Sequence, residues 1–208
     1  MQIFVRGDFT HSDDPKIIKE LHDVGFVDGV VVDVRTGGDV LKLESFIKNV
    51  CDVISTRIHI PILASGYEDI LDKAKVLLGF NKDLVVLSLP LSINGLKACK
   101  KLSDAEIPVN VTSCFSGAHA FLAAKAGAKY VSLPINNLDN SGFFGIDLIS
   151  DVCGIYENYP EIEAQVIVNV DSPVQLIEAA KLGCDVVSVT PQFLFKLAEN
   201  ACCCVKDF

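Results

Sequence analysis

Polar residues end most of the short apolar runs in this chain, and their types could do chemistry. The runs finish at Arg6, Asp33, Ala64-Ser65, Ser88, Thr112, Ser132, Asn169 with Asp171, and Thr190. This set holds one cation and two carboxylates, and it contains neither lysine nor histidine. Carboxylates and hydroxyls can hold and move protons, but a set without an amine cannot form an imine with a carbonyl group. The chemistry available at these positions is therefore proton handling and hydrogen bonding.

Two nearby residues could act as a nucleophile or a base. Cys114 follows Thr112, but no base stands beside it in the sequence, and this favours a buried small thiol. His119 lies in a predicted helix without an evident orienting partner, which favours a surface or packing role. The eight cysteines form no C-x-x-C pair that would suggest zinc, so we predict no metal site. We also predict no cofactor.

An alternation of apolar runs and helical stretches must position these residues. Strands are predicted over 2–6, 29–34, 57–63, 84–89, 108–112, 129–133, 164–170 and 185–190, and helices over 14–24, 40–54, 67–78, 93–103, 116–126, 146–156, 173–182 and 192–206. Strands rich in Val, Ile and Leu without polar alternation are typical of a parallel sheet buried on both faces. We predict an α/β fold, a single (β/α)8 barrel over residues 1–208, whose strands end at one mouth. The alternative, a doubly wound sheet, would prefer a glycine-rich turn after the first strand, and residues 6–10 (RGDFT) are not one.

Composition limits the partners of the chain. The net charge of −9 and the lack of a Lys/Arg-rich stripe argue against nucleic acid. No apolar stretch reaches the roughly 18 residues that a membrane span needs. The first eight residues hold no apolar signal segment, so a cytoplasmic location is expected.

Some segments leave alternatives open. Arg6 and Asp33 end adjacent predicted strands, so they could form an ion pair, or Arg6 could simply extend to solvent. Residues 136–142 (NNLDNSG) are interpreted as a polar turn, and Phe143-Phe144 as lying over the mouth or at a subunit contact. Residues 202–204 (CCC) are interpreted as an alanine-like run in a terminal helix, with an oxidation-prone or lipidated tail as the alternative.

Three consecutive segments carry a family resemblance. Residues 85–98 (VVLSLPLSINGLKA) resemble V-V-x-K-[IV]-P-x-T-x-x-G-L-x-A, the strand-four motif of small transaldolases and fructose-6-phosphate aldolases. Residues 110–116 (NVTSCFS) resemble the strand-five motif N-V-T-x-x-F-S, and residues 123–132 (AAKAGAKYVS) resemble A-A-x-A-G-A-x-Y-[VI]-S. The order and spacing of the three motifs identify the chain as similar to this family, which implies a barrel of the class I aldolase type.

The resemblance implies a reaction whose residues are largely replaced here. In the family, a lysine forms a Schiff base with the keto carbon of a sugar phosphate, and this lysine matches Ser88. The proton-handling aspartate of strand one matches Arg6, and the ordering asparagine of strand two matches Asp33. Among the chemically active positions, only the threonine of strand five is kept, as Thr112.

The phosphate-binding positions implied by the resemblance are replaced as well. The arginine that follows strand six matches Asn137, and the serine and arginine of strand seven match Asn169 and Asp171. A carboxylate at the last position would repel a phosphate. The ligand implied by the family is a small sugar or sugar phosphate.

Three hypotheses follow for the function. The chain could be a family barrel without aldol catalysis that now serves in binding or structure. It could process a sugar through other residues, such as Asp33, Asp171 and Thr112. A lysine could also reach the mouth from an unexpected place, although the strand ends offer none. The family commonly assembles into rings, so a homo-oligomer is expected.

Overall fold

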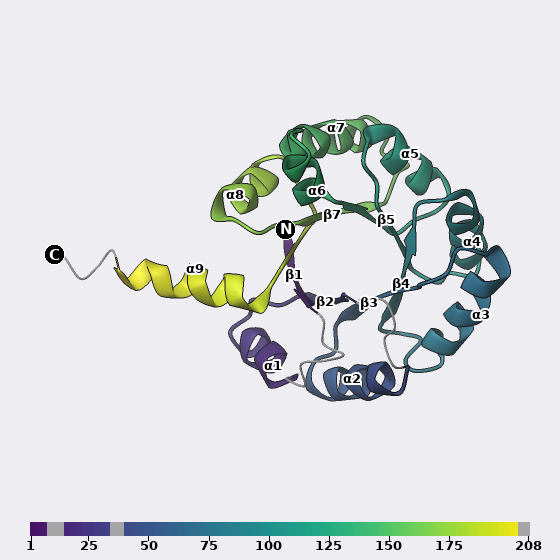
Figure 1. Ribbon diagram of the computed structural model, residues 1–208, viewed down its shortest axis with the longest axis horizontal. Helices are drawn as coiled ribbons and strands as arrows, with labels where there is room; N and C mark the ends of the chain where they lie inside the picture. Colours follow the sequence, from purple (N-terminus) through teal and green to yellow (C-terminus); the bar gives the residue numbers. More distant parts are fainter. Residues whose placement is uncertain (8–14, 34–39, 204–208) are drawn as a thin grey trace.

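The fold is known from a computed structural model, which describes residues 1–7, 15–33 and 40–203. Across these residues eight strands close into one parallel barrel, and helices surround it (Figure 1). The strands are β1 (Gln2–Gly7), β2 (Gly29–Val32), β3 (Arg57–Pro61), β4 (Val85–Pro90), β5 (Val109–Thr112), β6 (Tyr130–Leu133), β7 (Gln165–Asn169) and β8 (Val186–Val189). The helices are α1 (Pro15–Asp23), α2 (Val40–Val53), α3 (Tyr67–Leu78), α4 (Ile93–Ser103), α5 (Gly117–Lys125), α6 (Ile135–Asn140), α7 (Gly145–Asn158), α8 (Pro173–Lys181) and α9 (Pro191–Cys203).

Each strand pairs in parallel with the next one in sequence, and the ring closes where β1 pairs with β8. The register joins Gln2 to Val186 and Val5 to Val189. This closure confirms the predicted barrel and excludes the doubly wound alternative. Within the described residues, the predicted strands and helices match the observed ones to within about two residues, an ordinary uncertainty for element boundaries.

The strands are buried on both faces because apolar side chains cover each side. The larger cluster fills the space between the strands and the helices. A smaller cluster fills the barrel interior and is formed by Phe4, Val86, Tyr130, Ile167 and Val186. This double burial explains why the strands lack polar alternation in the sequence.

Gly29 lets the interior cluster form. It is paired in register with Phe4, and a Cβ atom at Gly29 would lie 2.5 Å from the Phe4 ring. Any side chain would therefore overlap that ring.

One helix was not predicted. Residues 136–142 were interpreted as a polar turn, but α6 occupies most of this segment, and only Ser141-Gly142 forms a turn after it. The segment is short and polar, so it lacks the apolar periodicity by which the other helices were recognised.

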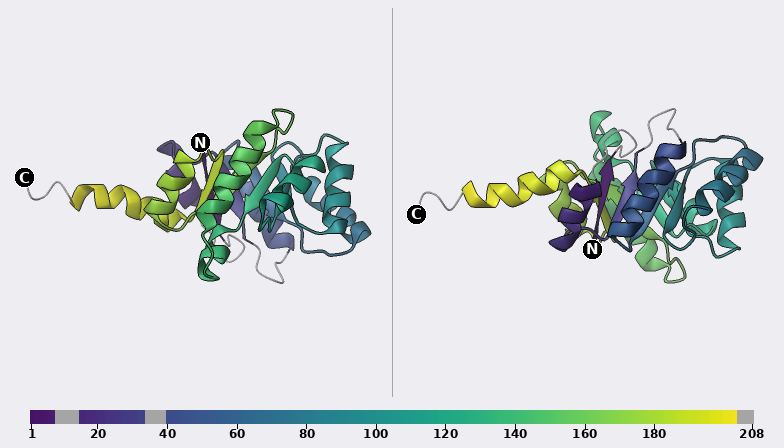
Figure 2. Two further views of the ribbon diagram at one scale, coloured as in Figure 1. Left: turned by 90° about the horizontal axis from the view of Figure 1, so that it is seen from above. Right: turned by 90° about the horizontal axis from the view of Figure 1, so that it is seen from below.

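The last helix leaves the body of the barrel. Figures 1 and 2 show α9 projecting outward from the ring, and it packs mainly on α1 and β1 near its start. Its first turns bury Leu194, whereas Lys196 to Glu199 are exposed. The prediction that the cysteine run belongs to a terminal helix holds as far as Cys203. The expectations placed on residues 8–14, 34–39 and 204–208 lie outside the described residues.

Candidate functional site at the barrel mouth

Ser88 lies in the middle of β4 and faces the barrel interior. Its side chain is nearly buried, with 5% of its surface exposed. The side-chain amide of Asn110 on β5, the register partner of Ser88, donates a hydrogen bond to Ser88 Oγ at 3.2 Å. Ser132 Oγ on β6 in turn donates to Asn110 Oδ1 at 3.0 Å. Three adjacent strands thus present a connected row of polar side chains to the interior, and Ser88 is part of it.

Arg6 at the end of β1 forms the main ion pair of the mouth. Its guanidinium pairs with Asp171, just after β7, and its Nε atom donates to the carbonyl oxygen of Ser188 at 3.3 Å. The Arg6 side chain is 15% exposed and that of Asp171 is 56% exposed. The sequence left open whether Arg6 pairs with Asp33 or extends to solvent; the structure instead pairs it with a carboxylate two strands away, across β8.

Asp171 also belongs to a network that reaches two helices. Asn136 Nδ2 on α6 donates to Asp171 Oδ2 at 2.5 Å, and the Asp171 amide donates to Gln175 Oε1 on α8 at 3.0 Å. Gln175 Nε2 donates to Asn136 Oδ1 at 2.9 Å and to Asp139 Oδ2 at 3.0 Å. We call Arg6, Asp171, Asn136, Gln175 and Asp139 the mouth network. It fixes one side of the barrel mouth.

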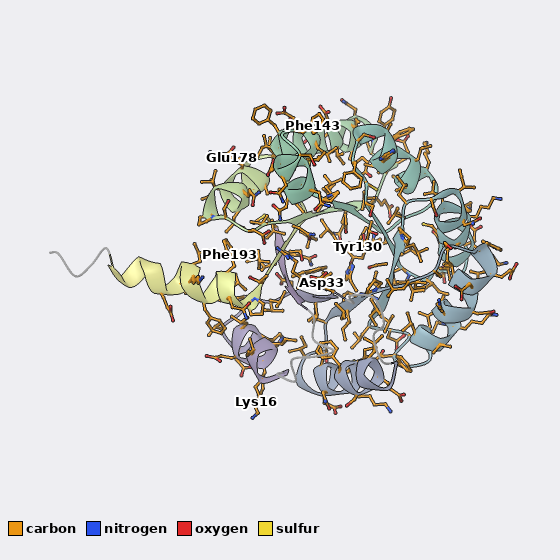
Figure 3. The ribbon with its side chains drawn as sticks, in the orientation of Figure 1. Lys16, Asp33, Tyr130, Phe143, Glu178 and Phe193 are labelled. Carbon is orange, nitrogen blue, oxygen red and sulfur yellow. The ribbon has the colours of Figure 1, made fainter. Side chains whose placement is uncertain are left out.

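The other predicted site residues lie near the mouth but outside this network. Thr112 Oγ1 donates to the carbonyl oxygen of Leu89 at 3.2 Å, so its hydroxyl proton is directed at backbone. Asn137 is exposed on α6, whereas its neighbour Asn136 makes the network contacts. Asn169 ends β7 in register with Ser188. Asp33 follows β2, and its amide donates to Gly7 O at 2.9 Å; Figure 3 shows it toward the centre of the ring.

His59 lies one layer below the mouth, and the sequence interpretation did not identify it. Its ring is fully buried inside the barrel, 5.1 Å from the Phe4 ring and 4.7 Å from the Tyr130 ring between centroids. Neither ring nitrogen has a hydrogen-bond partner among the described residues. Burial, and secondly the positive charge of Arg57, lower the pKa of His59 to about 3, so the ring is neutral. The sequence signal that could have found it is a histidine between two isoleucines in β3, two residues before Pro61.

Cys114 and His119 have the structural roles that the sequence favoured. Cys114 is fully buried, and burial raises the pKa of its thiol to about 12. His119 Nδ1 accepts a hydrogen bond from the Phe115 amide at 3.3 Å, which fixes the loop before α5. Phe143 and Phe144 are strongly exposed, and Figure 3 shows Phe143 over the ring of helices, away from the barrel axis.

The strands supply no amine to the interior. No lysine occurs within β1 to β8. Lys82 and Lys129 precede β4 and β6, at the opposite end of the barrel. Lys73 on α3 donates to the carbonyl oxygen of Leu63 at 2.8 Å and to Asp69 at 3.0 Å. Within the described part of the chain, no group of three His, Cys, Asp or Glu side chains could hold a metal ion.

A large cavity lies away from the mouth. It has a volume of about 770 Å³ and sits at the N-terminal ends of the strands, where Arg57, Lys82, Lys129 and Tyr130 contribute to its wall. Barrel enzymes carry their chemistry at the opposite end. We therefore keep the mouth as the candidate site, because it gathers the interior polar groups.

Comparisons with known proteins agree on one family. A family model described as "Transaldolase/Fructose-6-phosphate aldolase" matches residues 34–203. A "Probable transaldolase" of Nitrosopumilus maritimus is 36% identical over 189 residues, which cover 88% of this chain and 83% of that protein. A "Probable transaldolase" of Brucella anthropi is 35% identical over 196 residues, and one of Paracoccus denitrificans is 34% identical over 197 residues; each covers 92% of this chain and 88% of the relative.

The barrel was expected from the sequence motifs, and the matches extend over nearly the whole chain. No described helix is long and apolar enough to cross a membrane. The chain belongs to the transaldolase/fructose-6-phosphate aldolase family.

Proposed function

We propose that this chain is a transaldolase-family barrel that has lost Schiff-base aldol chemistry and binds a small sugar through hydrogen bonds at its mouth. The observation that carries the proposal is Ser88. By the strand-four motif it matches the family's lysine position, and it faces the barrel interior, where it accepts a hydrogen bond from Asn110. A hydroxyl group cannot form an imine with a ketose, so the first covalent step has no nucleophile at this position.

The charge of the mouth supports a neutral ligand over a phosphorylated one. By the motif resemblance, Asp171 matches a position where the family has a phosphate-binding arginine, and it already pairs with Arg6. Repulsion between unit charges about 4 Å apart is roughly 1 kcal/mol in water and greater at a partly buried site. Hydroxyl and amide groups such as Ser88, Asn110 and Ser132 suit the hydroxyls of a sugar.

A second candidate function is a sugar-processing reaction through other residues. Asp33 and Asp171 are exposed carboxylates at the mouth, and Thr112 is close to it. Such a reaction would handle protons without a covalent intermediate. Both candidates leave no borohydride-trapped adduct, but only this second one cleaves or isomerises the substrate, so turnover of the substrate separates them.

Borohydride trapping tests the loss of Schiff-base chemistry. The full chain is incubated with dihydroxyacetone or fructose 6-phosphate, reduced with borohydride, and analysed by intact mass and peptide mapping. We expect no adduct on the wild-type chain. The Nitrosopumilus maritimus relative serves as the comparison protein in the same assay.

Two variants sharpen the result. Ser88→Lys places an amine at the family position, and Ser132→Lys places one two strands away in the same polar row. We expect an adduct on Ser88→Lys and none on Ser132→Lys. A specific adduct at any native lysine of the wild-type chain would overturn the proposal, whatever the variants do.

We further propose that the chain forms a single domain over residues 1–208, assembles as a homo-oligomer and works in the cytoplasm. The projection of α9 from the ring (Figure 2) supports assembly, because this helix exposes 37% of the surface of the apolar residue Leu197. Leu197→Glu should lower the molar mass measured by light scattering if α9 packs on a second copy. An unchanged mass would exclude this helix from the interface.

A further inference from the structure

The cavity at the N-terminal ends of the strands presents charged side chains of both signs. Its volume of about 770 Å³ falls in the range of small-molecule sites. Arg57, Lys82 and Lys129 contribute positive charge to its wall, and Glu106, Glu161 and Glu163 contribute negative charge. These residues lie at or just before the starts of β3 to β7, so five consecutive units of the barrel converge on this cavity.

The charges on this wall do not neutralise one another. Within the described part of the chain, none of these residues forms an ion pair with another side chain. Arg57 donates from Nη1 to the carbonyl oxygen of Asp83 at 2.7 Å, which leaves other N–H groups of its guanidinium for further bonds. Lysines on the outer helices are paired instead, as Lys73 is with Asp69 at 3.0 Å. The cavity therefore offers charged groups of both signs to a ligand.

Glu106 lines the cavity from an unfavourable backbone conformation. Its φ angle is +59°, and the amide of the next residue bonds back to a carbonyl oxygen of α4 at 3.0 Å. This is the Schellman pattern, in which glycine is usual. Helices α1, α5 and α8 end in the same pattern with Gly25, Gly127 and Gly183 at the equivalent position. A side chain where glycine is unstrained indicates a role for its carboxylate.

Packing holds the wall of the cavity in shape. A Cβ atom at Gly127 would lie 2.4 Å from Ser103 Oγ, so the ends of α4 and α5 approach each other closely. Tyr130 is 7% exposed and reaches from the interior cluster to the cavity wall, and Figure 3 shows it inside the ring of strands. Burial raises the pKa of the Tyr130 hydroxyl, and the charge of Arg57 offsets part of this rise. The site is thus formed before a ligand arrives, which lowers the free energy spent on ordering it.

We propose that this cavity binds a zwitterionic ligand, an amino acid or short peptide that carries both ammonium and carboxylate groups. Together with Lys125 and Asp83, the wall holds four basic and four acidic residues. A ligand of one sign would leave half of these groups unmatched and would bring its charge close to like charges. A zwitterion forms charge-assisted hydrogen bonds with both sets. The site lies at the opposite end of the strands from the mouth and does not depend on the proposed sugar binding.

Calorimetry with a dipeptide tests this assignment. The full chain is titrated with lysylglutamate, which carries its ammonium groups on one residue and its carboxylates on the other. Glutarate and cadaverine, whose charges are of one sign only, are titrated in parallel. We expect saturable binding of the dipeptide that weakens with added salt. Both one-sign compounds should bind at least about ten-fold more weakly.

Variants of the wall locate the site. Lys129→Gln and Glu106→Gln each remove one charge and should weaken dipeptide binding about ten-fold, because a hydrogen bond between charged groups is lost. Glu106→Gly separates binding from folding: glycine suits this backbone conformation, so the melting temperature should not fall, whereas binding should weaken as in Glu106→Gln. Lys196→Gln is the matched control that should bind like wild type, because this lysine lies on α9 and outside the cavity wall.

Several results would overturn the proposal. They are the absence of saturable heat with the dipeptide at millimolar concentration, equal binding of glutarate or cadaverine, and unchanged dipeptide binding in Lys129→Gln and both Glu106 variants. Asp171→Ala changes the mouth and should bind the dipeptide like wild type. Weakened binding in that variant would place the dipeptide at the mouth instead.

Discussion

Replacement of His59 by phenylalanine tests how the barrel interior depends on pH. The imidazole is fully buried against Phe4 and Tyr130, and its nitrogens have no described partner. Burial, followed by Arg57, lowers its pKa from 6.5 to about 3. In the unfolded chain the residue binds a proton near pH 6.5, but in the folded chain it does so only near pH 3. The stability that rests on the neutral ring is therefore complete above pH 6.5 and is lost as the pH falls toward 3.

The size of the effect follows from this interval. Each pH unit within it changes the free energy of unfolding by about 1.4 kcal/mol. We expect the free energy of unfolding to fall by about 2 kcal/mol between pH 6.5 and pH 5, and by about 5 kcal/mol over the whole interval, relative to a chain in which residue 59 does not titrate. His59→Phe keeps a ring of similar size in the aromatic cluster and has no proton to bind.

Urea unfolding between pH 8 and pH 5 measures the difference. The free energy of wild type minus that of His59→Phe should fall steadily below pH 6.5. Val86→Ala is the matched control, because it removes a buried side chain from the same interior cluster and has no titrating group, so its difference from wild type should stay constant with pH. If the difference in free energy of unfolding between wild type and His59→Phe is the same at every pH in this range, the argument is refuted. The ring would then be protonated or hydrated inside the barrel.

Three further predictions concern the barrel interior, the start of α8 and the mouth. Gly29→Ala should lower the free energy of unfolding by about 1–3 kcal/mol, because its Cβ would overlap the Phe4 ring, and urea unfolding measures this; an unchanged value would mean that the ring moves freely. Ser172→Ala removes the side-chain oxygen that accepts from the Gln175 amide at the start of α8, and should cost about 1 kcal/mol in the same assay. Asp171→Ala removes the carboxylate that pairs with Arg6, and should tighten the binding of inorganic phosphate about five-fold at low salt in calorimetry, an effect that added salt should erase. Equal phosphate binding by wild type and this variant would contradict the role assigned to its charge.

The barrel could be predicted from the sequence because burial on both faces leaves a direct trace in the strands. A continuous Val run, as in β2, leaves no place for alternating polar residues when both sides of the strand are covered. Ser172 caps the start of α8 through its side chain, and Gly183 follows α8 with a positive φ angle; few other residue types fill these roles. Helix α6 was missed because it is only six residues long and most of its residues are polar.

The arrangement of the mouth could be predicted only in part. The sequence placed Arg6 and Asp171 at strand ends, but neighbouring strands suggested Asp33 as the partner of Arg6. The long side chain of Arg6 reaches past β8 to Asp171, and the order of the strands in the sequence does not show how far a side chain reaches. Asn136 and Gln175 come from helices, whose contribution to the mouth depends on how α6 and α8 pack.

Closure of the ring through β1 and β8 has a consequence for how the chain is made. The two strands that become neighbours lie at opposite ends of the sequence, with Val5 paired to Val189. A ribosome must release almost the entire chain before this pairing can occur, and until then β1 has an open edge. Pairings so distant in sequence slow folding, and an unpaired strand edge is a template for association with other chains. The final stage of synthesis is therefore the stage at which this protein depends most on protection from aggregation.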